Sequence, residues 1–114
     1  MGTDVKKWFE NFQADMAKTG RVVPNAVSGF GAFFSKVMGE GALSIREKEL
    51  IALGIGVALR CEPCIRLHVK KCLDAGASKE QILDAAQVAV MMGGGPVYTY
   101  LPLVVETLDA LTAK

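Results

Sequence analysis

Three cysteines and a single histidine are the residues of this 114-residue chain whose types and spacing could do chemistry. Cys61 and Cys64 are separated by two residues, His68 follows four residues later, and Cys72 follows after four more. On a helix, residues three or four apart share one face, so the three thiols and the imidazole fall on one stripe. Two residues between thiols also allow a small disulfide ring, in which one sulfur attacks and the other resolves the intermediate.

The cysteine pair is expected at the start of a helix. Pro63 is tolerated in a first helical turn, and the residues after it run without a break to Gly76, a good residue for ending a helix. Thiols react as thiolates, which the positive end of a helix stabilises. Arg60 and Arg66 flank the pair and could favour a thiolate slightly, but we expect both to point to solvent. An odd number of cysteines, with no secretory signal before them, favours a reactive or metal-binding pair over a structural disulfide framework.

Glu49 is the candidate proton carrier, because it falls on an otherwise apolar stripe of a helix predicted over residues 45–59. A carboxylate there either points outward or is held inside, where it can accept and return protons. If this helix and the next form an antiparallel hairpin, Glu49 lies opposite Cys72, and His68 is one turn away, about 5–6 Å along the axis. The arithmetic therefore predicts a relay from Glu49 through His68 to Cys64.

The elements that position these residues all show helical periodicity, and no stretch alternates as a strand would. Predicted helices cover about 4–18, 24–38, 45–59, 61–75, 79–92 and 96–111. The sequence Thr19-Gly20-Arg21 is expected to end the first helix, and Pro102 is expected to distort the last one. The Gly93 to Gly95 run indicates a break that allows close backbone packing. We therefore predict an all-α fold of about six helices, in one domain that spans residues 1–114.

Composition limits the class of partner. The chain has 13 Lys and Arg against 12 Asp and Glu, a net charge of +1, which provides no basic surface for nucleic acid. Hydrophobic residues make up 51% of the chain, whereas a domain of this size buries only about 60–65% of its unfolded surface. Some apolar surface is therefore expected to meet another subunit. Phe30, Phe33 and Phe34 are predicted to be core or subunit-contact residues.

A membrane location is not favoured by the pattern. The uncharged run from Ala85 to Val105 is long enough to span a bilayer, but glycines, Pro96 and Pro102 interrupt it, so it predicts two soluble helices. The first ten residues contain Asp4 and Glu10 and no apolar segment typical of a secretory signal. The cytoplasm is the expected compartment.

The spaced Glu, Cys, Cys and His set resembles the AhpD-like alkylhydroperoxidase branch of the carboxymuconolactone decarboxylase family. The matching residues run from about Leu43 to Pro96 and are Glu49, Cys61, Cys64, His68, Gly76, Ala77, Ser78, Gly94, Gly95 and Pro96. The resemblance implies an all-helical subunit that is an obligate homo-oligomer, a trimer or hexamer. It also implies a redox-active cysteine pair that reduces peroxides or disulfides and is reduced again by a dithiol partner such as a lipoyl-bearing protein.

The same resemblance implies a role for each matched residue. Cys64 would attack the peroxide, Cys61 would resolve the intermediate as a disulfide, and Glu49 and His68 would relay protons. No cofactor and no metal are implied, and Cys72 is expected to be a packing residue.

Three other interpretations are open at this point. Zinc could take Cys61, Cys64 and His68 with a fourth ligand, although structural zinc usually draws its ligands from two separate knuckles. The pair could be a redox-sensitive element of an oligomeric binding protein without turnover. The chain could also be a lactone decarboxylase, although family members with that activity generally lack the cysteine pair.

Overall fold

The computed structural model describes the backbone of residues 2–113 and the side chains of residues 4–113. Its helices are α1 (Gly2–Val22), α2 (Pro24–Met38), α3 (Ile45–Ala58), α4 (Glu62–Asp74), α5 (Lys79–Gly93), α6 (Gly95–Tyr98) and α7 (Leu101–Thr112). The described residues contain no strand, so the all-α prediction is confirmed. Of the helices in this part of the chain, none is both long and apolar enough to cross a membrane.

Two helices begin where side chains satisfy the first free backbone N–H groups. At the start of α3, the hydroxyl of Ser44 accepts a hydrogen bond from the Glu47 N–H at 3.1 Å, and the Glu47 carboxylate accepts one from the Ser44 N–H at 2.8 Å. Ser78 and Gln81 make the same reciprocal pair at the start of α5. These contacts join residues three apart, so the sequence pattern alone located both helix starts.

The first helix is longer than the sequence pattern indicated. Thr19 and Gly20 do not end it, because the Val23 N–H still donates to the Thr19 carbonyl at 2.8 Å. A glycine inside a helix costs only about 1 kcal/mol, and continued backbone hydrogen bonding offsets it. The helix instead ends beside Pro24, which has no N–H and opens α2.

The last predicted helix is divided into a single turn, α6, and the longer α7. Pro102 lies in the first turn of α7. A missing N–H matters little there, so the break falls just before the proline instead of at it. The glycine run before α6 allows the close packing that we expected, since a Cβ on Gly93 would collide with the side chain of Val97.

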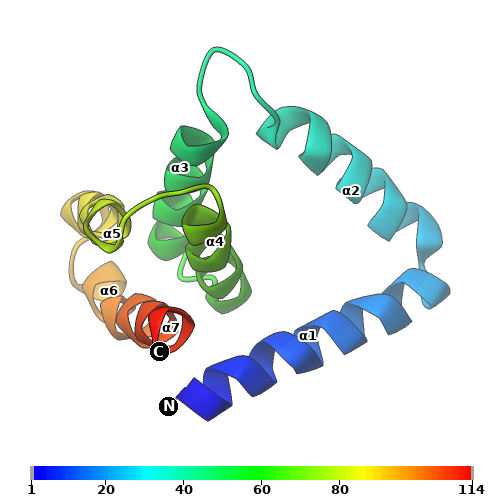
Figure 1. Ribbon diagram of the computed structural model, residues 1–114, viewed down its shortest axis with the longest axis horizontal. Helices are drawn as coiled ribbons and strands as arrows, with labels where there is room; N and C mark the ends of the chain where they lie inside the picture. The colour runs from blue at the N-terminus through cyan, green and yellow to red at the C-terminus, as the bar shows by residue number, and fades with distance from the viewer. Residues whose placement is uncertain (1, 114) are drawn as a thin grey trace.

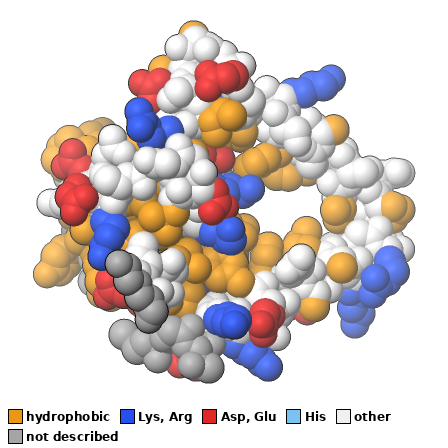
Figure 2. Space-filling model, in the orientation of Figure 1, with side chains coloured by type: hydrophobic (Ala, Val, Ile, Leu, Met, Phe, Trp, Pro, Cys, Tyr) orange, Lys and Arg blue, Asp and Glu red, His pale blue; other side chains and the backbone are white. Residues whose placement is uncertain are grey.

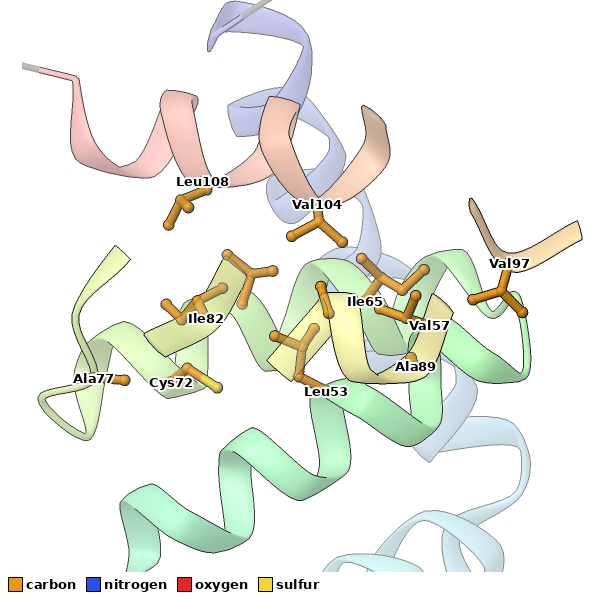
Figure 3. Close-up of a cluster of buried hydrophobic side chains, with 12 residues drawn as sticks. Leu53, Val57, Ile65, Cys72, Ala77, Ile82, Ala89, Val97, Val104 and Leu108 are labelled. Carbon is orange, nitrogen blue, oxygen red and sulfur yellow. The ribbon is translucent and has the colours of Figure 1, made fainter. Parts of the chain in front are cut away.

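Helices α3, α4, α5 and α7 form a body around one hydrophobic core (Figures 1 and 3). Its fully or almost fully buried residues are Leu53, Val57, Ile65, Val69, Cys72, Ala77, Ile82, Ala86, Ala89, Val97, Val104 and Leu108. Figure 3 shows these side chains converging from the surrounding helices, with the Cys72 sulfur among them. The core therefore fixes α3 against α4, the two helices that carry the candidate site.

Helices α1 and α2 form an arm that leaves this body and returns to it (Figure 1). No residue of α2 is buried, and the side chains of Phe30 and Phe33 are 66% and 64% exposed. These two residues are therefore not core residues. The alternative prediction, that they contact another subunit, stays a prediction. Figure 2 shows an opening between the arm and the body, with hydrophobic side chains along its edge.

Candidate active site

Cys61 and Cys64 are joined by a disulfide at the start of α4. Cys61 is the N-cap residue, and its sulfur accepts a hydrogen bond from the Cys64 N–H at 3.3 Å. Pro63 lies in the first turn, as predicted. The sulfur of Cys61 thus occupies the positive end of a helix, where negative charge is stabilised.

The backbone of α3 supports this turn through Gly56. A Cβ on Gly56 would lie 3.0 Å from the Cβ of Cys64. The Gly56 carbonyl also accepts a hydrogen bond from the Cys61 N–H at 3.0 Å. Arg60 makes the turn between the two helices with φ of 56°, in the left-handed region. A glycine inside a helical pattern was the signal that could have identified this close approach.

Replacing Gly56 by alanine is expected to lower the free energy of unfolding by about 1–3 kcal/mol, because the added methyl group pushes the first turn of α4 away from α3. Urea unfolding of the oxidised protein measures the change. Gly54→Ala is the matched control, since a Cβ there meets nothing nearer than the Ala85 carbonyl at 3.7 Å. An equal loss in both variants would mean that the contact with Cys64 is unimportant.

Glu49 and His68 form the second half of the site. The Nδ1 atom of His68 lies 2.7 Å from the Oε1 atom of Glu49, which is only 5% exposed. This is the contact that the hairpin arithmetic predicted. When Nδ1 carries the hydrogen and donates it to the carboxylate, Nε2 has a free lone pair, which is the state that a general base requires. His68 lies one helical turn after Cys64, on the same side of α4.

The arm contributes to the surroundings of this pair. The ring of Phe34, from α2, stacks on the ring of His68 with centroids 6.2 Å apart. The ammonium group of Lys71 lies 5.2 Å from the centroid of the same phenylalanine. Beside Glu49 a hollow of about 580 Å³ opens between α3 and α4, lined also by Arg46 and Lys71. The carboxylate therefore touches His68 and borders a hollow that solvent can enter.

Cys72 lies apart from this chemistry. Its side chain is fully buried in the core, and burial raises the pKa of the thiol to about 12, with the nearby Glu49 carboxylate adding to the shift. A thiol with this pKa is protonated at neutral pH and is a poor nucleophile. The structure thus places Cys72 as the packing residue that we expected.

We expect iodoacetamide to alkylate Cys61 and Cys64 in the reduced native protein at pH 7 to 8, and to leave Cys72 unmodified until the chain is unfolded. Burial blocks access of the reagent to Cys72, and it raises the pKa of the thiol so that the thiol stays protonated. Peptide mass mapping of samples taken over time measures the three rates. Comparable rates at all three cysteines in the native protein would overturn this assignment.

Among the residues that the structure describes, no three His, Cys, Asp or Glu side chains gather closely enough to hold a metal ion. The two thiols nearest each other are bonded to each other instead.

The expectation that both flanking arginines point to solvent is wrong for one of them. Arg60 is exposed, but Arg66 is only 8% exposed. Its guanidinium group is surrounded by side chains of α4 and α7 that neutralise and hydrogen-bond it. The two partners on α7 are 40 and 41 residues away in the chain, so no local pattern could reveal them.

Helices α3 and α4 form a hairpin with a disulfide at its turn and a carboxylate–imidazole pair beside the disulfide. These features define a class of all-helical protein with a thiol site. The chain belongs to the carboxymuconolactone decarboxylase family, whose family model matches residues 24–106. The match begins with α2 and contains Glu49, Cys61, Cys64 and His68.

Two relatives match most of the length of this chain. An uncharacterised protein of Cupriavidus necator is 30% identical over 113 residues, 99% of this chain and 100% of the relative. An uncharacterised protein in the cox locus of Paracoccus denitrificans is 34% identical and covers 86% of this chain and 88% of its own length.

Two solved structures share the fold. A carboxymuconolactone decarboxylase family protein of Legionella pneumophila, in its apo form, superposes with a TM-score of 0.87 at 29% identity, covering 93% of this chain and 95% of the other. A family member from Thermotoga maritima, for which involvement in an antioxidative response has been suggested, gives a TM-score of 0.71 at 36% identity, covering 75% and 89% of the two chains.

Proposed function

We propose that this protein is a thiol-dependent peroxidase or disulfide oxidoreductase of the AhpD-like type. The observation that carries the proposal is the Cys61–Cys64 disulfide at the start of α4, with His68 one turn along the same helix and hydrogen-bonded to the buried Glu49 of α3. The disulfide is the oxidised product of the reaction, and the carboxylate–imidazole pair is a device for moving the protons that the reaction requires. The suggested antioxidative involvement of the Thermotoga maritima relative supports the same chemistry.

The reaction balances with the residues of the site. His68 takes the proton of the Cys64 thiol, and the thiolate attacks one oxygen of a peroxide ROOH. The O–O bond breaks, giving a sulfenic acid on Cys64 and, with the proton returned through His68, the alcohol ROH. The Cys61 thiol then attacks that sulfur, water leaves, and the disulfide forms. A dithiol reductant returns both cysteines to thiols by exchange and becomes a disulfide itself.

The proposed function requires a reducing compartment and a dithiol reductant. The pair works repeatedly only where a dithiol keeps reducing it, so we place the protein in the cytoplasm. A lipoyl group on a partner protein is a dithiol of the required kind. Lactone decarboxylation would leave the disulfide without a role, and such activity would survive simultaneous substitution of Cys61 and Cys64.

The attacking thiol can be identified by removing the resolving one. In Cys61→Ser, peroxide is expected to convert Cys64 to a sulfenic acid that persists long enough to be trapped by dimedone and located by peptide mass mapping. The matched variant Cys64→Ser should give little label at Cys61. Label that accumulates at Cys61 and not at Cys64 would reverse the two roles.

The proposed assembly is a homo-oligomer in which a second copy covers the exposed face of α2. On one side α2 carries an exposed apolar stripe of Phe30, Phe33 and Val37. Elsewhere on the same chain, an apolar groove of about 410 Å³ lies between α3 and α5, lined among others by Ile55 and Val88, and no charged residue lines it. A helix face docked in such a groove is a common mode of association. Stripe and groove are different surfaces, so copies can pair head-to-tail, and where the rotation between neighbours closes, this pairing gives the ring proposed here, a trimer or a stacked hexamer.

Phe33→Glu and Ile55→Lys are each expected to give monomers in sedimentation experiments, because each puts a charge into the apolar contact. An equimolar mixture of the two should give dimers, since the intact stripe of Ile55→Lys fits the intact groove of Phe33→Glu, while the contacts that would close the ring stay broken. Val105→Glu, at an exposed apolar residue of α7, is the control and should leave the assembly unchanged. A mixture that stays monomeric would argue against stripe-to-groove pairing.

A further inference from the structure

A buried guanidinium group belongs to α4, the helix that begins at the cysteine pair. Arg66 follows Cys64 by two residues on α4 and is 8% exposed. Each of its side-chain nitrogens has one partner. Nε donates to Glu62 at 3.1 Å, Nη1 to Thr107 at 3.0 Å and Nη2 to Glu106 at 2.9 Å. Burying a cation is costly unless it is paired, so full pairing of all three nitrogens indicates a built position and not a chance contact.

The partners of Arg66 connect the first turn of α4 to two other helices. Thr107 is fully buried on α7, and its hydroxyl donates in turn to the Leu103 carbonyl at 2.8 Å. From α1, the ring of Trp8 lies 5.6 Å from the centre of the guanidinium group. Arg66 therefore holds together the turn with the disulfide, the body of the protein and the start of the arm.

The contact between Arg66 and Glu62 bears on the chemistry of the cysteine pair. Glu62 lies between the two cysteines in the sequence, in the first turn of α4. A negative charge on the same helical turn as two thiols opposes thiolate formation through its field, and so it favours the disulfide over the reduced pair. Arg66 pairs with that carboxylate at 3.1 Å and offsets part of its charge, because the same guanidinium group also pairs with Glu106 at 2.9 Å.

We propose that Arg66 is a positioning residue for the cysteine pair, which offsets the charge of Glu62 and fastens the first turn of α4 to α1 and α7. The inference rests on the proposed redox function of the pair. It assigns to Arg66 the control of how easily the Cys61–Cys64 disulfide is reduced, although Arg66 does not touch the reacting atoms.

The test is the equilibrium of the protein with glutathione, in which two glutathione thiols reduce the protein disulfide and leave as oxidised glutathione. In Arg66→Met the Glu62 charge is no longer offset, so the equilibrium constant for reduction should fall several-fold, as expected for one added charge at a partly exposed site. Quantifying reduced and oxidised protein by alkylation and mass measurement gives the constant without any peroxide.

Charge compensation separates this role from a purely structural one. Glu62→Gln should raise the same constant several-fold, and the double variant with Arg66→Met should return towards the wild-type value. Because the Glu62 side chain is 49% exposed, its variant is expected to fold even where Arg66→Met does not. Arg66→Lys should keep the wild-type constant but melt at a lower temperature, because lysine retains the charge and loses the three-way hydrogen bonding.

The outcomes decide between the two proposals. Unchanged constants in Glu62→Gln and Arg66→Met, in proteins that still exchange with glutathione, would overturn the role of Arg66 and leave the proposed function intact. A wild-type disulfide that exchanges neither with glutathione nor with a dithiol would instead remove the proposed function itself.

Discussion

Replacing Cys64 by serine is expected to reduce peroxide consumption to the rate measured without protein. The hydroxyl of serine is not ionised near neutral pH and does not attack a peroxide oxygen, so neither the sulfenic acid nor the disulfide can form. The measurement is the loss of an organic hydroperoxide in the presence of a dithiol such as dihydrolipoamide.

Cys72→Ala is the matched control for the loss of a thiol. Cys72 is buried in the core and takes no part in the proposed steps, so this variant should consume peroxide at the wild-type rate. Its free energy of unfolding should fall by about 1 kcal/mol, since removing a buried sulfur leaves a small cavity. If Cys64→Ser and Cys72→Ala retained the same peroxide-dependent rate, the enzymatic proposal would be wrong.

Glu49→Gln and His68→Asn are each expected to slow the peroxide reaction about 100-fold, the scale of general acid–base catalysis. In His68→Asn the general base is removed. In Glu49→Gln a neutral amide replaces the carboxylate that stabilises the imidazolium, which forms when His68 takes the thiol proton. The rate of sulfenic acid formation at a fixed peroxide concentration is the quantity to measure.

Two comparisons make this prediction specific. Because Glu49 acts through His68, to which it is hydrogen-bonded at 2.7 Å, the double variant should be little slower than His68→Asn alone. Glu47→Gln, two residues earlier, changes a carboxylate that is exposed and caps α3, and it should keep the wild-type rate. Effects of Glu49→Gln and His68→Asn that multiply in the double variant would show that the two residues act separately.

The parts of the fold set by local contacts could be predicted from the sequence. The starts of α3 and α5 depend on Ser44 and Ser78 and on the side chains three residues later, so both patterns are visible without a structure. The approach of Glu49 to His68 followed from helix geometry alone once a hairpin was assumed. The end of α1 was not predictable in the same way, because the low helical preference of Gly20 is outweighed by hydrogen bonds that continue to Val23.

The parts set by distant partners could not be predicted. Arg66 looks like a surface residue in sequence, and only the folded chain brings Glu106 and Thr107 against it. Periodicity showed that Phe30 and Phe33 share a face of α2 but not that this face leaves the body of the subunit. The role of Gly56 was hidden for a similar reason, since a glycine in a helix does not reveal which residue approaches it.

Counting the peroxide molecules consumed by each subunit tests the central claim most directly. Reduced wild-type protein is mixed with excess organic hydroperoxide, with and without dihydrolipoamide, and the remaining peroxide is titrated over time. Without the dithiol we expect one equivalent to be consumed as the Cys61–Cys64 disulfide forms, and with the dithiol we expect many equivalents at a steady rate. One equivalent and no more, whatever dithiol is added, would show that the pair is a redox-sensitive element of the assembly and not the active site of a peroxidase.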